Sequence, residues 1–185
     1  MNDNTGIYNR GEKMRKIFLT ILLCLCAIPL WANETDTLKE MTAISTPAEF
    51  RVFSQFYYTN PRPDLVSGFI RFIVTNKLNE DKSYHKHVIP FLGEIFKAND
   101  DKIAEWFQPV GELSNSDVYV LCAALHWSSM TNAKKQFLVL MKKATDPKLG
   151  EYLADLMEKY CVEDMRTVVV TSPEQMDMIW NCFFA

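Results

Sequence analysis

The three histidines are the first residues to test for chemistry. His85 and His87 stand two residues apart, a spacing that places two side chains on one face of a strand but not of a helix. The polar residues before them indicate a turn entering a helix, so the pattern favours surface histidines over a zinc site. His126, beside Trp127, is more typical of a histidine at the edge of a core than of a catalytic base.

The cysteines and serines are the next candidates, as nucleophiles. Cys122 lies in an apolar run and fits a small core residue. Cys161 and Cys182 could pair, but nothing in the sequence shows that their α-carbons come close enough. A cysteine or serine nucleophile needs a histidine and an orienting group, and the sequence places neither beside Cys161 nor beside Ser128-Ser129.

The sequence contains no H-E-x-x-H, no G-x-S-x-G and no phosphate-binding glycine loop. The acidic pairs Asp100-Asp101 and Glu163-Asp164 are explained by a helix cap and a solvated turn. We therefore predict that the protein is not an enzyme, with no catalytic residue, no metal site and no cofactor. A hydrolase that uses Cys161 or a serine together with a histidine stays the alternative.

The N-terminal region has the pattern of a secretory signal peptide. Four basic residues, Arg10, Lys13, Arg15 and Lys16, precede an apolar run that ends at Leu30-Trp31-Ala32. The run is short of the ~20 residues that a spanning helix needs, and Pro29 interrupts it. We predict a signal peptide at 1–32, no stable membrane span after cleavage, and a periplasmic or secreted protein of a Gram-negative bacterium. Met14 also starts a complete signal and is an alternative first residue.

The composition bounds the class of the exported part. The formal net charge of the chain is −3, so there is no basic excess and we expect no nucleic-acid partner. The hydrophobic fraction of 48% and the charged fraction of 23% are those of an ordinary globular protein. Only 6 glycines are present, which suits a helical domain.

Helix-start signals divide the rest of the chain. Residues 33–45 are polar and predict a flexible lead-in to a helical domain at 46–185. Thr46-Pro-Ala-Glu49 and Ser172-Pro-Glu-Gln175 have the form of capping boxes, and Asp146-Pro147 is a cap followed by proline. Apolar residues at helical spacing predict an all-α fold of seven to eight short helices in antiparallel pairs, as an irregular bundle or a short α-solenoid. The one β-like run, 165–171, predicts an extended connector.

One predicted helix differs from the others. The run 114–128 is apolar on nearly every side, with a possible cap at Ser114, Asn115 or Ser116 and Asp117 in the first turn. A helix that is apolar all round is buried by its neighbours. We therefore expect this helix to form the centre of the fold.

Two further groups of residues bear on binding. Lys134, Lys135, Lys142 and Lys143 lie on roughly one side of the next helix, where a solvated face explains them better than a binding patch. The aromatic residues exceed what a minimal helical core requires, and their helical spacing favours core positions; any that line a groove would suit a peptide or an apolar ligand. The leading hypothesis is a binding module whose partner is another protein or a peptide. An apolar ligand carrier is the alternative.

Two resemblances complete the sequence evidence. Ala133, Phe137 and Pro147 match the second helix and closing proline of a tetratricopeptide unit, although the first-helix pattern and a repeat period are missing. The C-terminal Ser172-Pro-x-x-x-Asp177-x-x-Trp180-x-x-Phe183-Phe-Ala resembles the closing motif of a family of uncharacterised, exported, all-helical bacterial proteins. Members of that family continue with a turn and another helix, so the resemblance implies a short member or a truncated reading frame. It transfers no catalytic residue.

Overall fold

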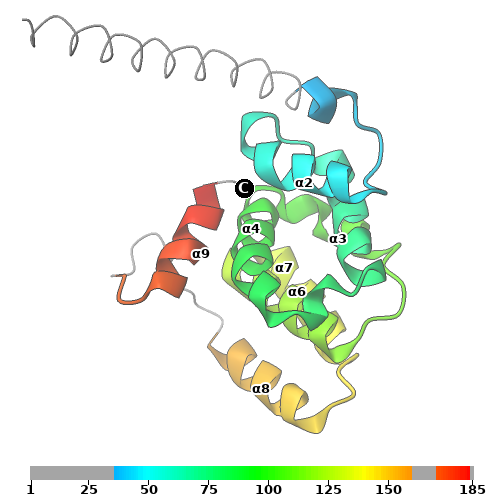
Figure 1. Cartoon of the computed structure of the whole chain (residues 1–185). Coiled ribbons are helices and arrows are strands. Elements are labelled where there is room, and N and C mark those ends of the chain that lie inside the picture. Colours follow the sequence, from blue (N-terminus) through cyan, green and yellow to red (C-terminus); the bar gives the residue numbers. More distant parts are fainter. Residues whose placement is uncertain (1–35, 160–169, 184–185) are drawn as a thin grey trace, which may run out of the picture.

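The computed structural model describes residues 36–159 and 170–183. In these residues the protein is all-helical, as predicted, and contains no strand. After a helical stretch at 36–40, the α-helices are α2 Pro47–Phe56, α3 Val66–Thr75, α4 His85–Ala98, α5 Ile103–Phe107, α6 Asn115–Ser128, α7 Thr131–Met141, α8 Pro147–Glu158 and α9 Pro173–Phe183 (Figure 1). Short 3-10 turns are η1 Tyr57–Thr59, η2 Pro63–Leu65, η3 Leu78–Glu80, η4 Lys82–Tyr84 and η5 Asp100–Lys102. The predicted signal peptide, Cys161 and most of the 165–171 connector lie outside the described residues.

Helix α6 lies at the centre of the fold, as its sequence predicted. Six of its apolar side chains are buried: Val118, Val120, Leu121, Cys122, Ala124 and Leu125. It packs most extensively against α4 and α7 and also contacts α8. The apolar residues on all sides of α6 are therefore explained by neighbours on several sides.

Local capping signals are confirmed at three helix starts. Thr46 and Glu49 form a reciprocal capping box at α2, and Ser114 and Asp117 form another at α6. Asp146 accepts a hydrogen bond from the backbone N–H of Lys148 at the start of α8. At α9, Ser172 Oγ accepts from the N–H of Gln175 as expected, but the Gln175 side chain accepts from Thr171 instead of closing the box on Ser172.

The α2 capping box makes stability depend on acid pH. The Glu49 carboxylate accepts hydrogen bonds from the N–H and hydroxyl groups of Ser45 and Thr46, which lowers its pKa from 4.5 to about 2. A carboxyl whose pKa is lower in the folded state stabilises the fold above its unfolded pKa, and this stabilisation is lost as the pH falls towards the folded pKa. We expect the stability advantage of the wild type over Glu49→Gln to be largest near neutral pH and to shrink between pH 4.5 and 2, as urea melts across that range would measure. An advantage that does not change with pH would contradict this account.

Helix α7 is capped by a residue distant in the sequence. Its own N-cap, Met130, makes no side-chain capping bond. Instead the Asp100 carboxylate accepts the backbone N–H of Asn132 at 3.1 Å and that of Ala133 at 3.0 Å. Asp100 was expected to cap the helix that follows it. The structure corrects this prediction, because the Asp100 side chain reaches N–H groups in the first turn of α7 that have no acceptor within their own helix.

Removal of this cap should lower stability measurably. We expect Asp100→Ala to reduce the free energy of unfolding by about 1–2 kcal/mol, because two backbone N–H groups at the positive end of α7 lose their acceptor. Asp101→Ala is the matched control: its side chain is exposed, so the change should stay within about 0.5 kcal/mol. Equal losses in the two urea melts would show that the Asp100 cap does not stabilise α7.

Residues 36–45 are not the flexible lead-in that their polarity predicted. Leu38, Met41 and Ile44 are buried in the core. The Arg62 guanidinium donates to the carbonyl oxygens of Leu38, Lys39 and Met41 and also pairs with Asp64. The three apolar side chains hold this otherwise polar segment on the domain. Arg62 donates hydrogen bonds to backbone carbonyl groups of the segment that have no partner within a helix.

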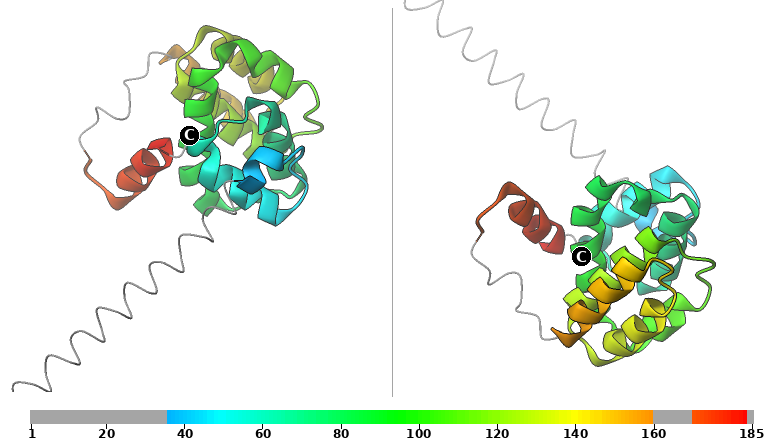
Figure 2. Two further views of the ribbon diagram at one scale, coloured as in Figure 1. Left: turned by 90° about the horizontal axis from the view of Figure 1, so that it is seen from above. Right: turned by 90° about the horizontal axis from the view of Figure 1, so that it is seen from below.

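Helix α9 lies on the outer side of α4, apart from the other helices in both views of Figure 2. Lys86 on α4 and Asp177 on α9 form an ion pair with an N–O distance of 2.7 Å. Within the described part of the chain, no helix is both long enough and apolar enough to cross a membrane.

Candidate functional site

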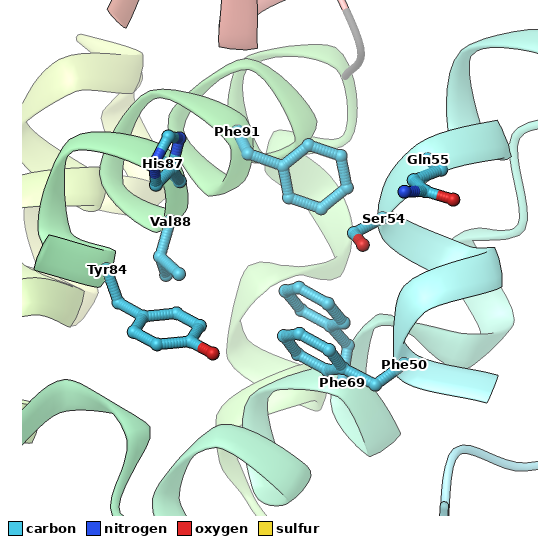
Figure 3. A pocket seen from close by; sticks show the side chains of 8 residues that line it. All are labelled: Phe50, Ser54, Gln55, Phe69, Tyr84, His87, Val88 and Phe91. Carbon is cyan, nitrogen blue, oxygen red and sulfur yellow. The ribbon is translucent and has the colours of Figure 1, made fainter. Parts of the chain in front are cut away.

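A groove lined by aromatic residues lies between α2 and α4. It encloses about 350 Å³ and is lined by Phe50, Ser54 and Gln55 of α2, Phe69 of α3, Tyr84 of η4, and His87, Val88 and Phe91 of α4. Phe69, Val88 and Phe91 form its floor and are only 1–5% exposed. Figure 3 shows these side chains around the open space. We refer to this region as the aromatic groove.

The walls of the groove belong to a packed set of rings. Phe50 and Phe69 stack with a centroid distance of 4.7 Å and an interplanar angle of 2°, as Figure 3 shows. Phe69 also contacts Phe53 and Phe91, at centroid distances of 4.9 and 5.4 Å. Rings held in this way lose little freedom when a ligand binds, so the groove is largely pre-formed.

A second pocket extends the groove along α2. It encloses about 360 Å³ and shares Phe50, Ser54 and Tyr84 with the first pocket. Its other lining residues come from α2, α3 and the segment that follows α3: Pro47, Arg51, Phe72, Asn76 and Leu78. The two pockets therefore adjoin each other, and Phe50, Ser54 and Tyr84 line both.

Polar side chains surround the first pocket. Gln55 and His87 are exposed, Tyr84 is 38% exposed, and Ser54 is half-buried. The neighbouring charges of Lys86 and Asp177 pair with each other, and this pairing lowers the pKa of Asp177. A ligand in this pocket would thus contact apolar rings below and hydrogen-bonding side chains at the edge.

The structure separates the two histidines that had a metal-like spacing. Both lie on α4, but only His87 is exposed and lines the groove. His85 is half-buried, against the expectation of a surface residue: its Nε2 lies 2.9 Å from the Asn79 carbonyl oxygen, and its ring packs near Tyr119. Among the described residues, no three His, Cys, Asp or Glu side chains gather so as to hold a metal ion.

Two of the candidate nucleophiles, Cys122 and Ser128, are buried in α6. Burial raises the pKa of Cys122 to about 12, which opposes formation of a thiolate at neutral pH. Ser128 is buried and its Oγ donates to the Leu125 carbonyl, while Ser54 Oγ donates to the Arg51 carbonyl. His126 is half-buried in α6, and burial lowers its pKa.

As their helical spacing predicted, many aromatic residues lie in the core, including Phe53, Phe56, Tyr57, Trp106 and Phe107. The groove itself was not located from the sequence. Nothing in the sequence marks Phe50, Gln55 or Tyr84 as residues that line a groove. Comparison of the chain with family models, with curated proteins and with solved structures found no match.

Proposed function

We propose that this protein is a non-enzymatic binding module that accepts apolar side chains of a partner protein or peptide in the aromatic groove. The observation that carries the proposal is the pair of adjoining pockets that share Phe50, Ser54 and Tyr84. Two sites of about 350 and 360 Å³ in line along α2 fit two successive side chains of one chain better than one compact molecule.

The chemistry of the lining supports a peptide. Apolar side chains of a bound peptide would bury their surface against the aromatic rings of the groove. The hydroxyl, amide and imidazole groups at the polar edge would form hydrogen bonds with the backbone of the peptide. This combination of apolar pockets and few polar groups is typical of peptide recognition.

The test uses the chain from Asn33 onward, because the described core begins at Leu38. Peptides selected from a random display library on this protein should be rich in aromatic residues and leucine. Ser54→Trp should weaken their binding at least tenfold, because Ser54 lines both pockets and an indole there would fill the groove.

Ala48→Trp is the matched control, since Ala48 is exposed on the same helix and lines neither pocket. It should leave peptide binding unchanged. Thermal melts of both variants establish that they fold. Peptides that bind Ser54→Trp as well as the wild type would place the binding site elsewhere and refute the proposal.

The proposal includes export to the bacterial periplasm, supported by the signal-like sequence at 1–32. The mass of the protein isolated from its host should match a chain that starts at Asn33, and the protein should appear in the periplasmic fraction. A full-length protein confined to the cytosol would contradict this part.

A carrier of a small apolar molecule is the second candidate, because about 350 Å³ is at the lower end of ordinary ligand pockets. Native mass spectrometry of protein from the host should then show a bound molecule that Ser54→Trp loses and Ala48→Trp keeps. Protein without such a molecule would count against this candidate.

A further inference from the structure

The outward face of α7 combines positive charge with exposed apolar side chains. Lys135 and Lys142 each lie three or four residues from both Leu138 and Val139, so these four side chains share one side. Leu138 is 40% and Val139 53% exposed. The buried residues Ala133, Phe137 and Leu140 occupy the opposite side. We refer to Lys134, Lys135, Leu138, Val139, Lys142 and Lys143 as the α7 face.

The lysines of this face are a local excess in an acidic protein. The chain carries a formal net charge of −3, yet four lysines stand within ten consecutive residues, at 134–143, that contain no carboxylate. No ion pair within the described residues involves Lys135, Lys142 or Lys143. Lys135 Nζ donates to the uncharged side chain of Asn132, so within the described residues no carboxylate neutralises these three lysines.

The shape of the face indicates the kind of partner. Leu138 and Val139 are exposed on the side of α7 opposite its buried residues. One pair of lysines stands about a turn before them and another about a turn after. The first pair lies within α7 and the second follows directly after its last residue, Met141. Apolar side chains between basic ones, along a helix, match the boundary of an anionic lipid bilayer, where the apolar groups enter the acyl region and the ammonium groups reach the phosphates.

We propose that the α7 face binds the protein peripherally to membranes that contain anionic phospholipid. The helices that chiefly pack against α7 are α5, α6 and α8, whereas the aromatic groove is formed mainly by α2 and α4. The two surfaces are thus built from different helices, and the proposal does not depend on the function of the groove. It uses no membrane-spanning segment.

The experiment is sedimentation of the chain from Asn33 onward with vesicles, which removes the apolar N-terminal segment as a competing membrane contact. We expect binding to vesicles of equal phosphatidylglycerol and phosphatidylcholine, weakening as salt is added, and no binding to pure phosphatidylcholine. Lys135→Gln with Lys142→Gln should weaken binding about thirtyfold, since each lysine near an anionic surface contributes about 1 kcal/mol. Leu138→Ser with Val139→Ser should also weaken it, because the apolar insertion is lost.

The control is Lys77→Gln with Lys82→Gln, which removes the same charge from exposed residues outside α7 and should leave vesicle binding unchanged. Three results would overturn the proposal. They are no binding to phosphatidylglycerol vesicles, equal weakening by the two lysine pairs, and binding to soluble poly-glutamate as tight as to the vesicles. The last result would assign the face to an acidic polypeptide.

Discussion

Leu121→Ala should lower the free energy of unfolding by ~2–5 kcal/mol, because the leucine side chain is fully buried in the central helix and its removal leaves a cavity. Such a loss is a large share of the ~5–15 kcal/mol of a typical domain. Leu121→Asp should be more damaging, since it would bury a charge that has no partner. Urea melts followed by circular dichroism would measure both changes.

The control for this prediction is Lys142→Ala, at an exposed position that follows α7. We expect it to change stability by no more than ~0.5 kcal/mol. If Leu121→Ala proved as mild as Lys142→Ala, α6 would not be the centre of the fold, and the packing described for α4, α6 and α7 would be wrong.

Local chemistry explains what could be predicted from the sequence. A helix cap involves residues only three or four positions apart. The starts of two helices can therefore be predicted from local sequence alone, one from Thr46 with Glu49 and the other from Asp146 before Pro147. Burial of α6 was predictable for a related reason: a helix with no polar face can be stable only when it is covered.

Contacts between distant residues explain what could not be predicted. Asp100 caps a helix that begins some thirty residues later, and Arg62 holds carbonyl groups more than twenty residues earlier. Nothing in the sequence distinguishes these two charged residues from others. Only the packing of the helices brings Asp100 to the N–H groups that donate to it and Arg62 to the carbonyl groups that accept from it. The burial of Leu38, Met41 and Ile44 likewise depends on the core that the other helices form.

The aromatic groove shows the same difference between features set by local sequence and features set by contacts between distant residues. Helical spacing correctly places Phe53 and Phe69 in the core, but a groove depends on the separation of α2 and α4 above Phe69 and Phe91. That separation is set by the whole core and not by the residues that line the space. The sequence therefore predicts the rings and not the opening between them.

Gly93 is the position where a small change should disturb the helix packing most directly. It lies in α4 against Trp127 of α6, and a Cβ at residue 93 would lie 2.5 Å from Trp127 Cδ1 and 2.8 Å from Trp127 Cβ. Rotation of the indole could move Cδ1 away, but Trp127 Cβ is fixed to the backbone. The two helices would have to separate to admit even a methyl group.

We therefore expect Gly93→Ala to lower the free energy of unfolding by ~1–3 kcal/mol, although alanine is the better helix former. Gly150→Ala in α8 is the matched control: a Cβ there meets nothing within 4 Å, so the change should stabilise the protein by up to ~1 kcal/mol. Urea melts of the two variants should thus shift in opposite directions. A stabilised Gly93→Ala would mean that α4 and α6 do not approach each other as closely at Gly93 as this structure places them.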